Sequence, residues 1–220
     1  MRLPPFRGCV APQRPVSINT DSPQCRDLES CWLGNTVAWG DIPVPGGLAA
    51  RTVGGTVIPG SHVGLVSTAQ VVMLPRTRLV SSPTTMVVWV QWTAQTALID
   101  VRNAAATAYH QIYLRGSGAA FRPTTNGNYT AISGTTLGAP IHLAMVCDGL
   151  SYRCGYYNGV AGAANTVTVA DGTLDRLSVG ASAVSTDAII EWRLYNRALT
   201  AAEIWSLYAP ETRWDLYAPA

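Results

Sequence analysis

Acidic side chains could give this sequence hydrolytic chemistry, because glycoside cleavage needs two carboxylates about 5 to 9 Å apart. The chain has 13 Asp and Glu residues. One strand can present two acids on alternate positions, which point to the same face. Glu191 lies in a strand-like stretch, but no second acid follows it two residues later. We therefore expect that the protein is not an enzyme.

Calcium binding is a weaker expectation. Calcium takes six to eight oxygen ligands, usually with several Asp or Glu side chains, whereas the candidates here, led by Asp148 and Asp171, are scattered. Asp148 precedes a glycine, and Asp-Gly favours a tight turn. Asp148 is therefore explained by its turn, and Asp148 and Asp171 stay weak calcium candidates. We expect no other cofactor.

The histidines and cysteines do not occur at the sequence spacings that are typical of metal sites. The three histidines are isolated, and His142 falls in a strand-like stretch, which favours a hydrogen-bonded core or interface histidine. The five cysteines are an odd number without zinc-like spacing. Cys147 and Cys154 flank a predicted turn and could face each other, but a disulfide needs Cα atoms within about 7 Å. We expect free, buried thiols.

Aromatic side chains could form a platform for sugars. The chain has seven Trp and nine Tyr. Those in predicted strands are expected to pack in the core. The candidates for glycan stacking are Trp39, Tyr129 and Trp205.

Composition argues against nucleic acid and membrane partners. The net charge is +2, and 13% of the residues are charged, about half the usual share of a quarter. All 15 basic residues are Arg, which indicates codon bias or, alternatively, a contact surface. No stretch approaches 18 apolar residues, so no membrane span is expected. The first residues carry Arg but no apolar run, which predicts no signal peptide and folding in a reducing cytoplasm.

The elements that must position these residues are short strands. Many strand-like stretches are separated by turn signals every 8 to 12 residues, which predicts an all-β, antiparallel two-sheet sandwich. Residues 84–93, TTMVVWVQWT, are apolar on both faces and are expected in the middle of the layers. Residues 140–160 predict a hairpin around Asp148-Gly149, with a second turn at Asn158-Gly159. Residues 62–75 have apolar positions at two-residue spacing.

One short helix is predicted over residues 201–208. Thr200 and Glu203 have the spacing of a capping box, and Leu199 and Ile204 that of a hydrophobic staple. Pro210 stops the helix. A helix of two turns is too short to be stable alone, so it must dock on the sandwich.

The ends of the chain differ from the middle. Residues 1–20 are rich in Pro and Arg and predict an extended arm rather than a strand or helix. Residues 21–209 form the predicted jelly-roll domain, and residues 210–220 an aromatic tail. Arm and tail are expected to contact other subunits through Arg2, Phe6, Arg7, Val10, Trp214 and Tyr217.

Three motifs carry a family resemblance: CDGLSYRCGYYNGV, LSVGA and IIEWRLYNRALTAAEIWSLYAP, in this order. They resemble the laminin-G-like, concanavalin A-like jelly roll. The resemblance is strong over Pro140–Pro210 and fainter over Asp21–Thr93, where Cys replaces more usual apolar or small residues. The final RWDLYAPA resembles aromatic tails of copies encoded by tailed bacteriophages. Residues 1–20 lie outside the resemblance.

The resemblance implies two functions. Because some relatives hydrolyse glucans with an ExDxxE arrangement that this chain lacks, it implies a non-enzymatic protein. The first hypothesis is a phage virion protein that decorates the capsid, held by arm and tail, with the major capsid protein and copies of itself as partners and the virion as its location. The alternative is a lectin-like carbohydrate-binding module for host-surface adsorption, in the tail or fibre.

Overall fold

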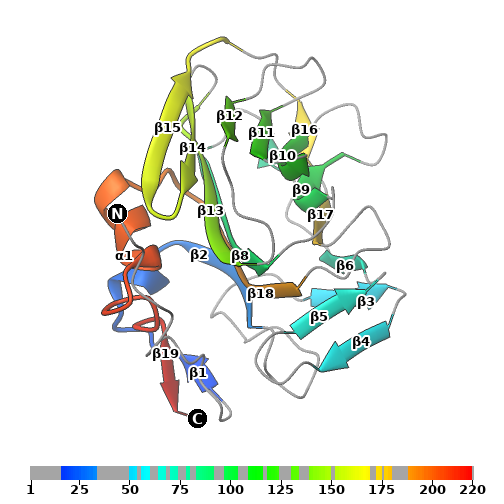
Figure 1. Ribbon diagram of the computed structural model, residues 1–220, viewed down its shortest axis with the longest axis vertical. Helices are drawn as coiled ribbons and strands as arrows, with labels where there is room; N and C mark the ends of the chain where they lie inside the picture. Colours follow the sequence, from blue (N-terminus) through cyan, green and yellow to red (C-terminus); the bar gives the residue numbers. More distant parts are fainter. Residues whose placement is uncertain are drawn as a thin grey trace.

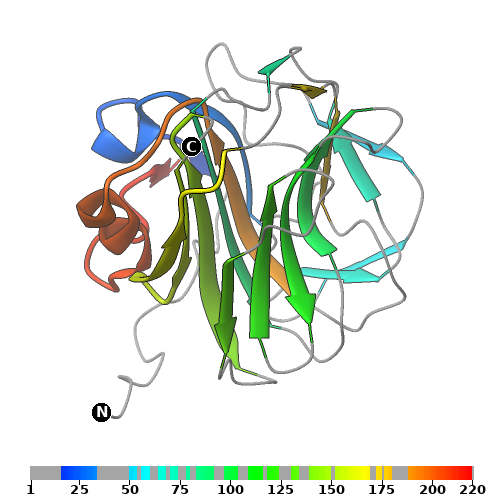
Figure 2. The same ribbon diagram turned by 90° about the horizontal axis from the view of Figure 1, so that it is seen from above.

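The chain folds into two facing antiparallel β-sheets, with the helix and the terminal segments against the outer face of one of them (Figures 1 and 2). This computed structural model describes residues 16–33, 50–53, 56–59, 64–67, 70–73, 78–79, 83–91, 97–103, 109–115, 118–123, 130–133, 139–149, 152–168, 172–174, 176–179 and 188–219.

Within the described residues, the first sheet has seven strands. In spatial order they are β12 (Thr130–Ser133), β11 (Gly118–Pro123), β10 (Tyr109–Arg115), β9 (Ala97–Arg102), β17 (Arg176–Val179), β6 (Gln70–Met73) and β3 (Ala50–Val53).

The part of the second sheet that the structure describes has eight strands. They are β15 (Val160–Asn165), β14 (Arg153–Tyr157), β13 (Pro140–Cys147), β8 (Thr84–Gln91), β18 (Ala188–Tyr195), β5 (Gly64–Ser67) and β4 (Thr56–Pro59), and β2 (Leu28–Leu33) pairs with β18 off this path. Two small two-stranded sheets join β7 (Arg78–Leu79) to β16 (Thr173–Leu174) and β1 (Val16–Ile18) to β19 (Tyr217–Pro219).

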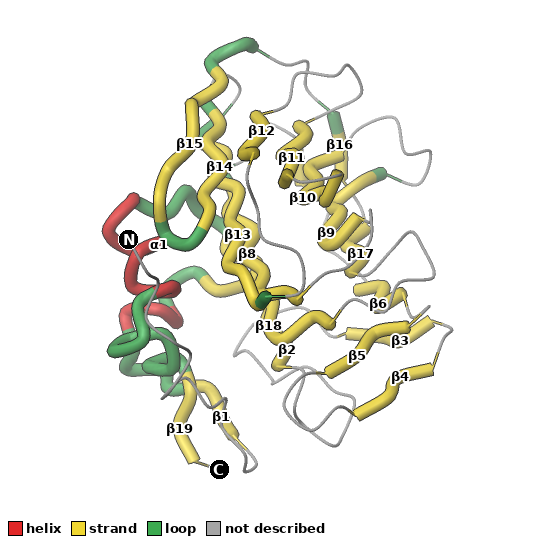
Figure 3. Tube along the Cα trace, viewed as in Figure 1, coloured by secondary structure: helices red, strands yellow, loops and turns green. Residues whose placement is uncertain are grey.

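Figure 3 shows how strands dominate the described chain. The all-β, antiparallel prediction is confirmed.

Strand β8 lies in the middle of the second sheet, between β13 and β18, as its apolar pattern predicts. Every described side chain from Thr84 to Val90 is buried. Successive residues of a strand point to opposite faces. Met86 therefore points between the sheets, on the same face as Gly155, which lies against the Phe121 ring of β11. Val87 points outward and joins the apolar cluster under the helix.

The hairpin of residues 140–160 has the predicted strands and turns. β13 and β14 are joined around Asp148-Gly149, and β14 and β15 around Asn158-Gly159. Asn158 and Gly159 have φ of 48° and 78°, as a type I′ turn requires at both central positions.

The run over residues 62–75 gives two strands rather than one. β5 joins the second sheet and β6 the first, so the chain crosses between the sheets within this run. Two-residue spacing of apolar side chains indicates a strand but does not show where the chain changes sheets.

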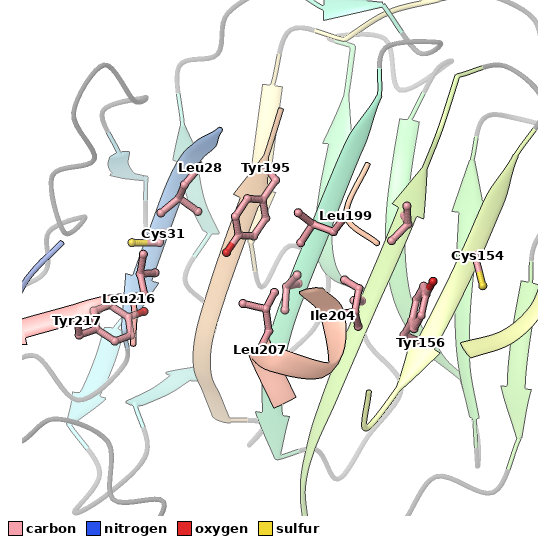
Figure 4. Packing of buried hydrophobic residues seen from close by; sticks show 13 residues of the cluster. Leu28, Cys31, Cys154, Tyr156, Tyr195, Leu199, Ile204, Leu207, Leu216 and Tyr217 are labelled. Carbon is pink, nitrogen blue, oxygen red and sulfur yellow. The ribbon is translucent and has the colours of Figure 1, made fainter. Parts of the chain in front are cut away.

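Helix α1 spans Ala201–Tyr208, as predicted. The Thr200 hydroxyl accepts the Glu203 N–H, and the Glu203 carboxylate accepts the Thr200 N–H at 2.8 Å, which completes the capping box. Ile204 and Leu207 are buried and point at the outer face of the second sheet (Figure 4). Among the described residues, no helix is long and apolar enough to cross a membrane.

The terminal segments form a third layer beside α1, which we call the terminal layer (residues 16–27 and 209–219). It contains β1, β19 and a short 3₁₀ turn, η1 (Pro23–Cys25). The last residues of the expected arm thus differ from the prediction, because Val16–Ile18 pairs with Tyr217–Pro219 and forms a strand. The tail is likewise folded against its own domain. Backbone pairing between segments about 200 residues apart has no local sequence signal.

Candidate functional site

Trp205 is the predicted glycan-stacking residue that falls within the described chain, and it lies on α1. Its side chain is 51% exposed. Trp39 and Tyr129 lie outside the described residues. The helix has 3.6 residues per turn, so Ile204 and Leu207 face the sheet while Trp205 faces away. Its neighbours on that helix face include Ala201 and Ala202, both exposed.

The Trp205 ring packs against a neighbouring ring of its own helix and against the β14–β15 turn. The Tyr208 ring packs edge-on against it, with centroids 5.4 Å apart and an interplanar angle of 62°. Gly159 of the β14–β15 turn lies against both rings, because an added Cβ would come within 2.8 Å of Trp205 Cε3 and 3.0 Å of Tyr208 Cδ1. Only glycine leaves space for the indole there. We call Trp205, Tyr208, Gly159 and the adjoining exposed Val160 the Trp205 platform.

The turn that supports the platform is fixed to the sheet. The Asn158 side-chain oxygen accepts the His142 N–H at 2.9 Å, and the Asn158 N–H donates to the His142 carbonyl at 2.8 Å. The turn therefore keeps its position relative to β13, and Gly159 keeps its position under Trp205.

An aromatic cluster continues from the platform into the protein. Tyr208 stacks on Trp89 at 5.8 Å, and Trp89 meets the His142 ring edge-on at 5.3 Å. The Trp89 indole N–H donates to the Leu207 carbonyl at 3.4 Å. The Arg213 guanidinium lies 3.6 Å from the centre of the Trp89 ring. The exposed indole thus stands on a packed base.

His142 is buried, and no hydrogen-bond partner for its ring nitrogens occurs among the described residues. Its pKa is lowered to about 3, mainly by burial and in addition by the positive charges of Arg213 and Arg193. The expected core position is observed, but an aromatic enclosure replaces the expected hydrogen bonds to the ring.

A buried ion pair lies under the terminal layer. Glu191 and Arg193 occupy alternate positions of β18 and share its outer face, and an Arg193 guanidinium nitrogen lies 2.6 Å from Glu191 Oε1. Arg193 also donates to Gln24 Oε1 at 2.7 Å and to the Arg213 carbonyl at 2.9 Å. Burial acts to lower the pKa of Arg193, but the Glu191 carboxylate together with Tyr195 and Tyr217 outweighs it, and the pKa is raised. The pair therefore binds both segments of the terminal layer to the sheet.

Two predicted interface residues lie in this layer instead of on a free tail. Tyr217 is 9% exposed, and its hydroxyl donates to Glu191 Oε1. Trp214 is half-buried, with the Arg213 guanidinium 4.1 Å above its ring. The tail folds back because the buried Glu191–Arg193 pair needs hydrogen-bond partners. The tail supplies them through the Tyr217 hydroxyl and the Arg213 carbonyl. Arg2, Phe6, Arg7 and Val10 lie outside the described residues.

The calcium candidates do not come together in the described chain. Asp148 is exposed in the β13–β14 turn, where its N–H donates to the Tyr152 carbonyl at 3.0 Å. Asp171 lies outside the described residues. Within the described ranges, no group of three or more His, Cys, Asp or Glu could hold a metal ion.

Cys147 and Cys154 are free and buried. Cys154 pairs across the strands with Val146, and Cys147 pairs with Arg153. Since neighbouring residues of a strand point to opposite faces, the two thiols lie on opposite sides of the sheet. Burial raises the pKa of Cys147 to about 12, which leaves it an unreactive thiol at neutral pH.

The chain belongs to the concanavalin A-like lectin/glucanases superfamily, because the laminin G-type model of that description matches residues 66–205, well over half of the chain. The expected family is thereby confirmed. No curated protein matches the sequence.

Two of the solved structures with the same fold are named as binding domains of toxins. The botulinum neurotoxin serotype D binding domain matches with a TM-score of 0.68 and 12% identity over 84% of this chain and 51% of that one. The binding domain of Paraclostridial Mosquitocidal Protein 1 matches with a TM-score of 0.65 and 12% identity, over 84% and 52%. This chain therefore spans about half the length of these toxin domains.

A third structure is matched over almost its whole length. Domain 4 of the extracellular arabinanase AbnA from Geobacillus stearothermophilus, solved in complex with arabinotriose, matches with a TM-score of 0.65 and 16% identity. The match covers 83% of this chain and 98% of that domain. At these identities the likeness establishes the fold.

Proposed function

We propose that the protein is a non-enzymatic binding domain whose ligand is a carbohydrate. The observation that carries this proposal is the exposed, supported Trp205 ring on the described surface. The superfamily includes lectins, and a domain of similar extent was solved with arabinotriose. Both facts support a glycan ligand by analogy of fold.

The architecture fits such a role. The terminal layer fixes both described ends of the chain on one side of the second sheet, through the β1–β19 pairing and the Glu191–Arg193 pair. A partner that held these two segments would therefore hold the domain from one side of the second sheet. A module of this kind can present its remaining surface to a ligand while a larger assembly holds its ends.

The test is binding of the intact chain to a printed array of oligosaccharides and to cell-wall material, with and without calcium. We expect binding to a subset of glycans that does not change when calcium is chelated. Absence of binding to every glycan under both conditions would exclude the lectin function. Binding lost on chelation would show that a calcium site is required.

A second candidate is a structural protein of a tailed-phage virion that decorates the capsid. The resemblance of RWDLYAPA to phage-encoded tails and the Pro- and Arg-rich residues 1–20 support it. Because Tyr217 is buried in its own domain, the attachment to the major capsid protein or to other copies falls to residues 1–15 and to Trp214. A decorated particle could also contact surface polysaccharide, so the two proposals are compatible.

Cryo-electron microscopy of assembled particles tests the virion proposal. We expect residues 1–15 to be ordered against neighbouring subunits. Particles that lack the protein, or that hold it with this segment free of all contacts, would contradict a decoration role.

A further inference from the structure

The packing of helix α1 on the sheet does not explain why position 205 is a tryptophan. Ile204 and Leu207 already dock the helix on the sheet, and both are almost completely buried. Trp205 leaves about half of a large apolar ring in solvent. Resting on the proposed glycan-binding function, we propose that the Trp205 platform is the binding site, and that one ring of a neutral sugar stacks on the indole.

The described surroundings of the ring are uncharged. Exposed Ala201 and Ala202 flank it on the helix, and exposed Val160 and Ala161 begin the neighbouring strand β15. The acid of α1, Glu203, projects to the opposite side of the helix, where it forms an ion pair with Arg197 at 2.7 Å. A neutral ligand suits this surface, since an acidic sugar would find no cation among these neighbours.

The platform is formed before a ligand arrives. The Tyr208 ring packs against the indole, and the left-handed backbone of Gly159 allows the turn to lie against both rings. The side chain therefore loses little conformational freedom on binding, and such preorganisation increases affinity. A flexible exposed Trp without these supports would offer no such advantage.

The size of the platform favours a sugar over a protein. A stable protein interface buries about 800 Å² on each partner around several anchoring side chains. Here one large exposed ring is flanked by the half-buried Tyr208 and by Ala, Gly and Val, which add little contact area. The C–H groups on one face of a sugar ring carry partial positive charge, and they suit the negative face of an aromatic ring of similar size.

The experiment measures apparent affinities by a concentration series of the intact chain on an array of neutral and sialylated oligosaccharides, with arabinotriose included. We expect Trp205→Ala to weaken binding to neutral glycans by about tenfold or more, and Trp205→Phe to weaken it less. Gly159→Ala should also weaken binding, because its Cβ displaces the indole without removing it. The matched control is Tyr152→Ala, an exposed aromatic at the other end of β14 that should leave binding unchanged.

The outcomes separate the site from the function. If the wild-type chain binds neutral glycans and Trp205→Ala binds them equally well, the site is wrong and the lectin function stands. If only sialylated glycans bind, the neutral class is wrong. If nothing binds, both proposals fail. Thermal melts of each variant show whether a loss of binding comes from unfolding. If Trp205→Ala is unfolded, the binding of Trp205→Phe, which keeps an aromatic ring, tests the site instead.

Discussion

His142 is a single residue that makes the stability of the fold depend on pH. Its pKa is about 3 in the folded protein and about 6.5 when unperturbed. Between these values the unfolded chain binds a proton that the folded chain does not, so stability rises with pH across this window. The full stability is present above about pH 6.5 and is lost as the pH falls toward 3.

We therefore predict that His142→Leu flattens the acid side of the stability profile. The wild-type free energy of unfolding should fall by at most about 1.4 kcal/mol per pH unit between pH 6 and 4 from this group. Urea unfolding at several pH values measures the slope for both proteins. Parallel curves for wild type and variant would show that His142 is not the group responsible.

The sequence predicted the position of a side chain correctly where that position depends on a single helix or strand. The exposure of Trp205 follows from helical spacing once Ile204 and Leu207 are assigned to the core. The contact of its ring with Gly159 could not be predicted, because it joins two elements through tertiary packing. The burial of Tyr217 likewise depends on Glu191, a partner on a different strand.

Among the elements, helix α1 depends on its cap. Thr200→Ala removes the hydroxyl that accepts the Glu203 N–H, and should lower the free energy of unfolding by about 1 kcal/mol. The Arg197 hydrogen bond, with help from Thr200, lowers the pKa of Glu203 to about 2, so this carboxylate keeps its charge to a lower pH than an unperturbed Glu.

Chemical denaturation at pH 7 measures this change. The control is Thr168→Ala, an exposed threonine outside the helix, which should change stability by less than about 0.5 kcal/mol. An equal effect of the two substitutions would mean that the capping box does not stabilise the fold.

Helix α1, the hairpin of residues 140–160 and the central position of β8 were all readable from local patterns, because capping residues, turn residues and two-sided apolarity act within a few positions. The division of residues 62–75 between two sheets was not, since strand pairing is decided by distant partners. The same holds for β1, whose partner β19 is about 200 residues away.

At the scale of the whole molecule, the two ends of the described chain stabilise each other. The Asn19 N–H donates to the Leu216 carbonyl at 2.8 Å, and the Gln24 side chain donates to the Thr212 carbonyl at 2.7 Å. Deleting residues 211–220 should therefore loosen residues 16–25 as well as exposing the Glu191–Arg193 pair.

Hydrogen–deuterium exchange tests this coupling. We expect the amides of residues 16–25 to lose protection in the truncated protein, while β13 and β8 in the middle of the second sheet keep theirs for longest. Unchanged protection of residues 16–25 would show that the N-terminal segment folds onto the sheet independently of the tail.

The pairing of β1 with β19 also determines how the protein responds to a mechanical load. Val16 lies opposite Pro219 at the outer end of the ribbon, and Ile18 opposite Tyr217 at the inner end. A force applied at the two ends peels the ribbon open one residue pair at a time, instead of straining all its hydrogen bonds together. The load reaches the contacts of Asn19 and Gln24 only afterwards. In a force–extension experiment the ribbon should therefore yield first, as a small low-force step, and act as an extensible joint that protects the sandwich from rupture.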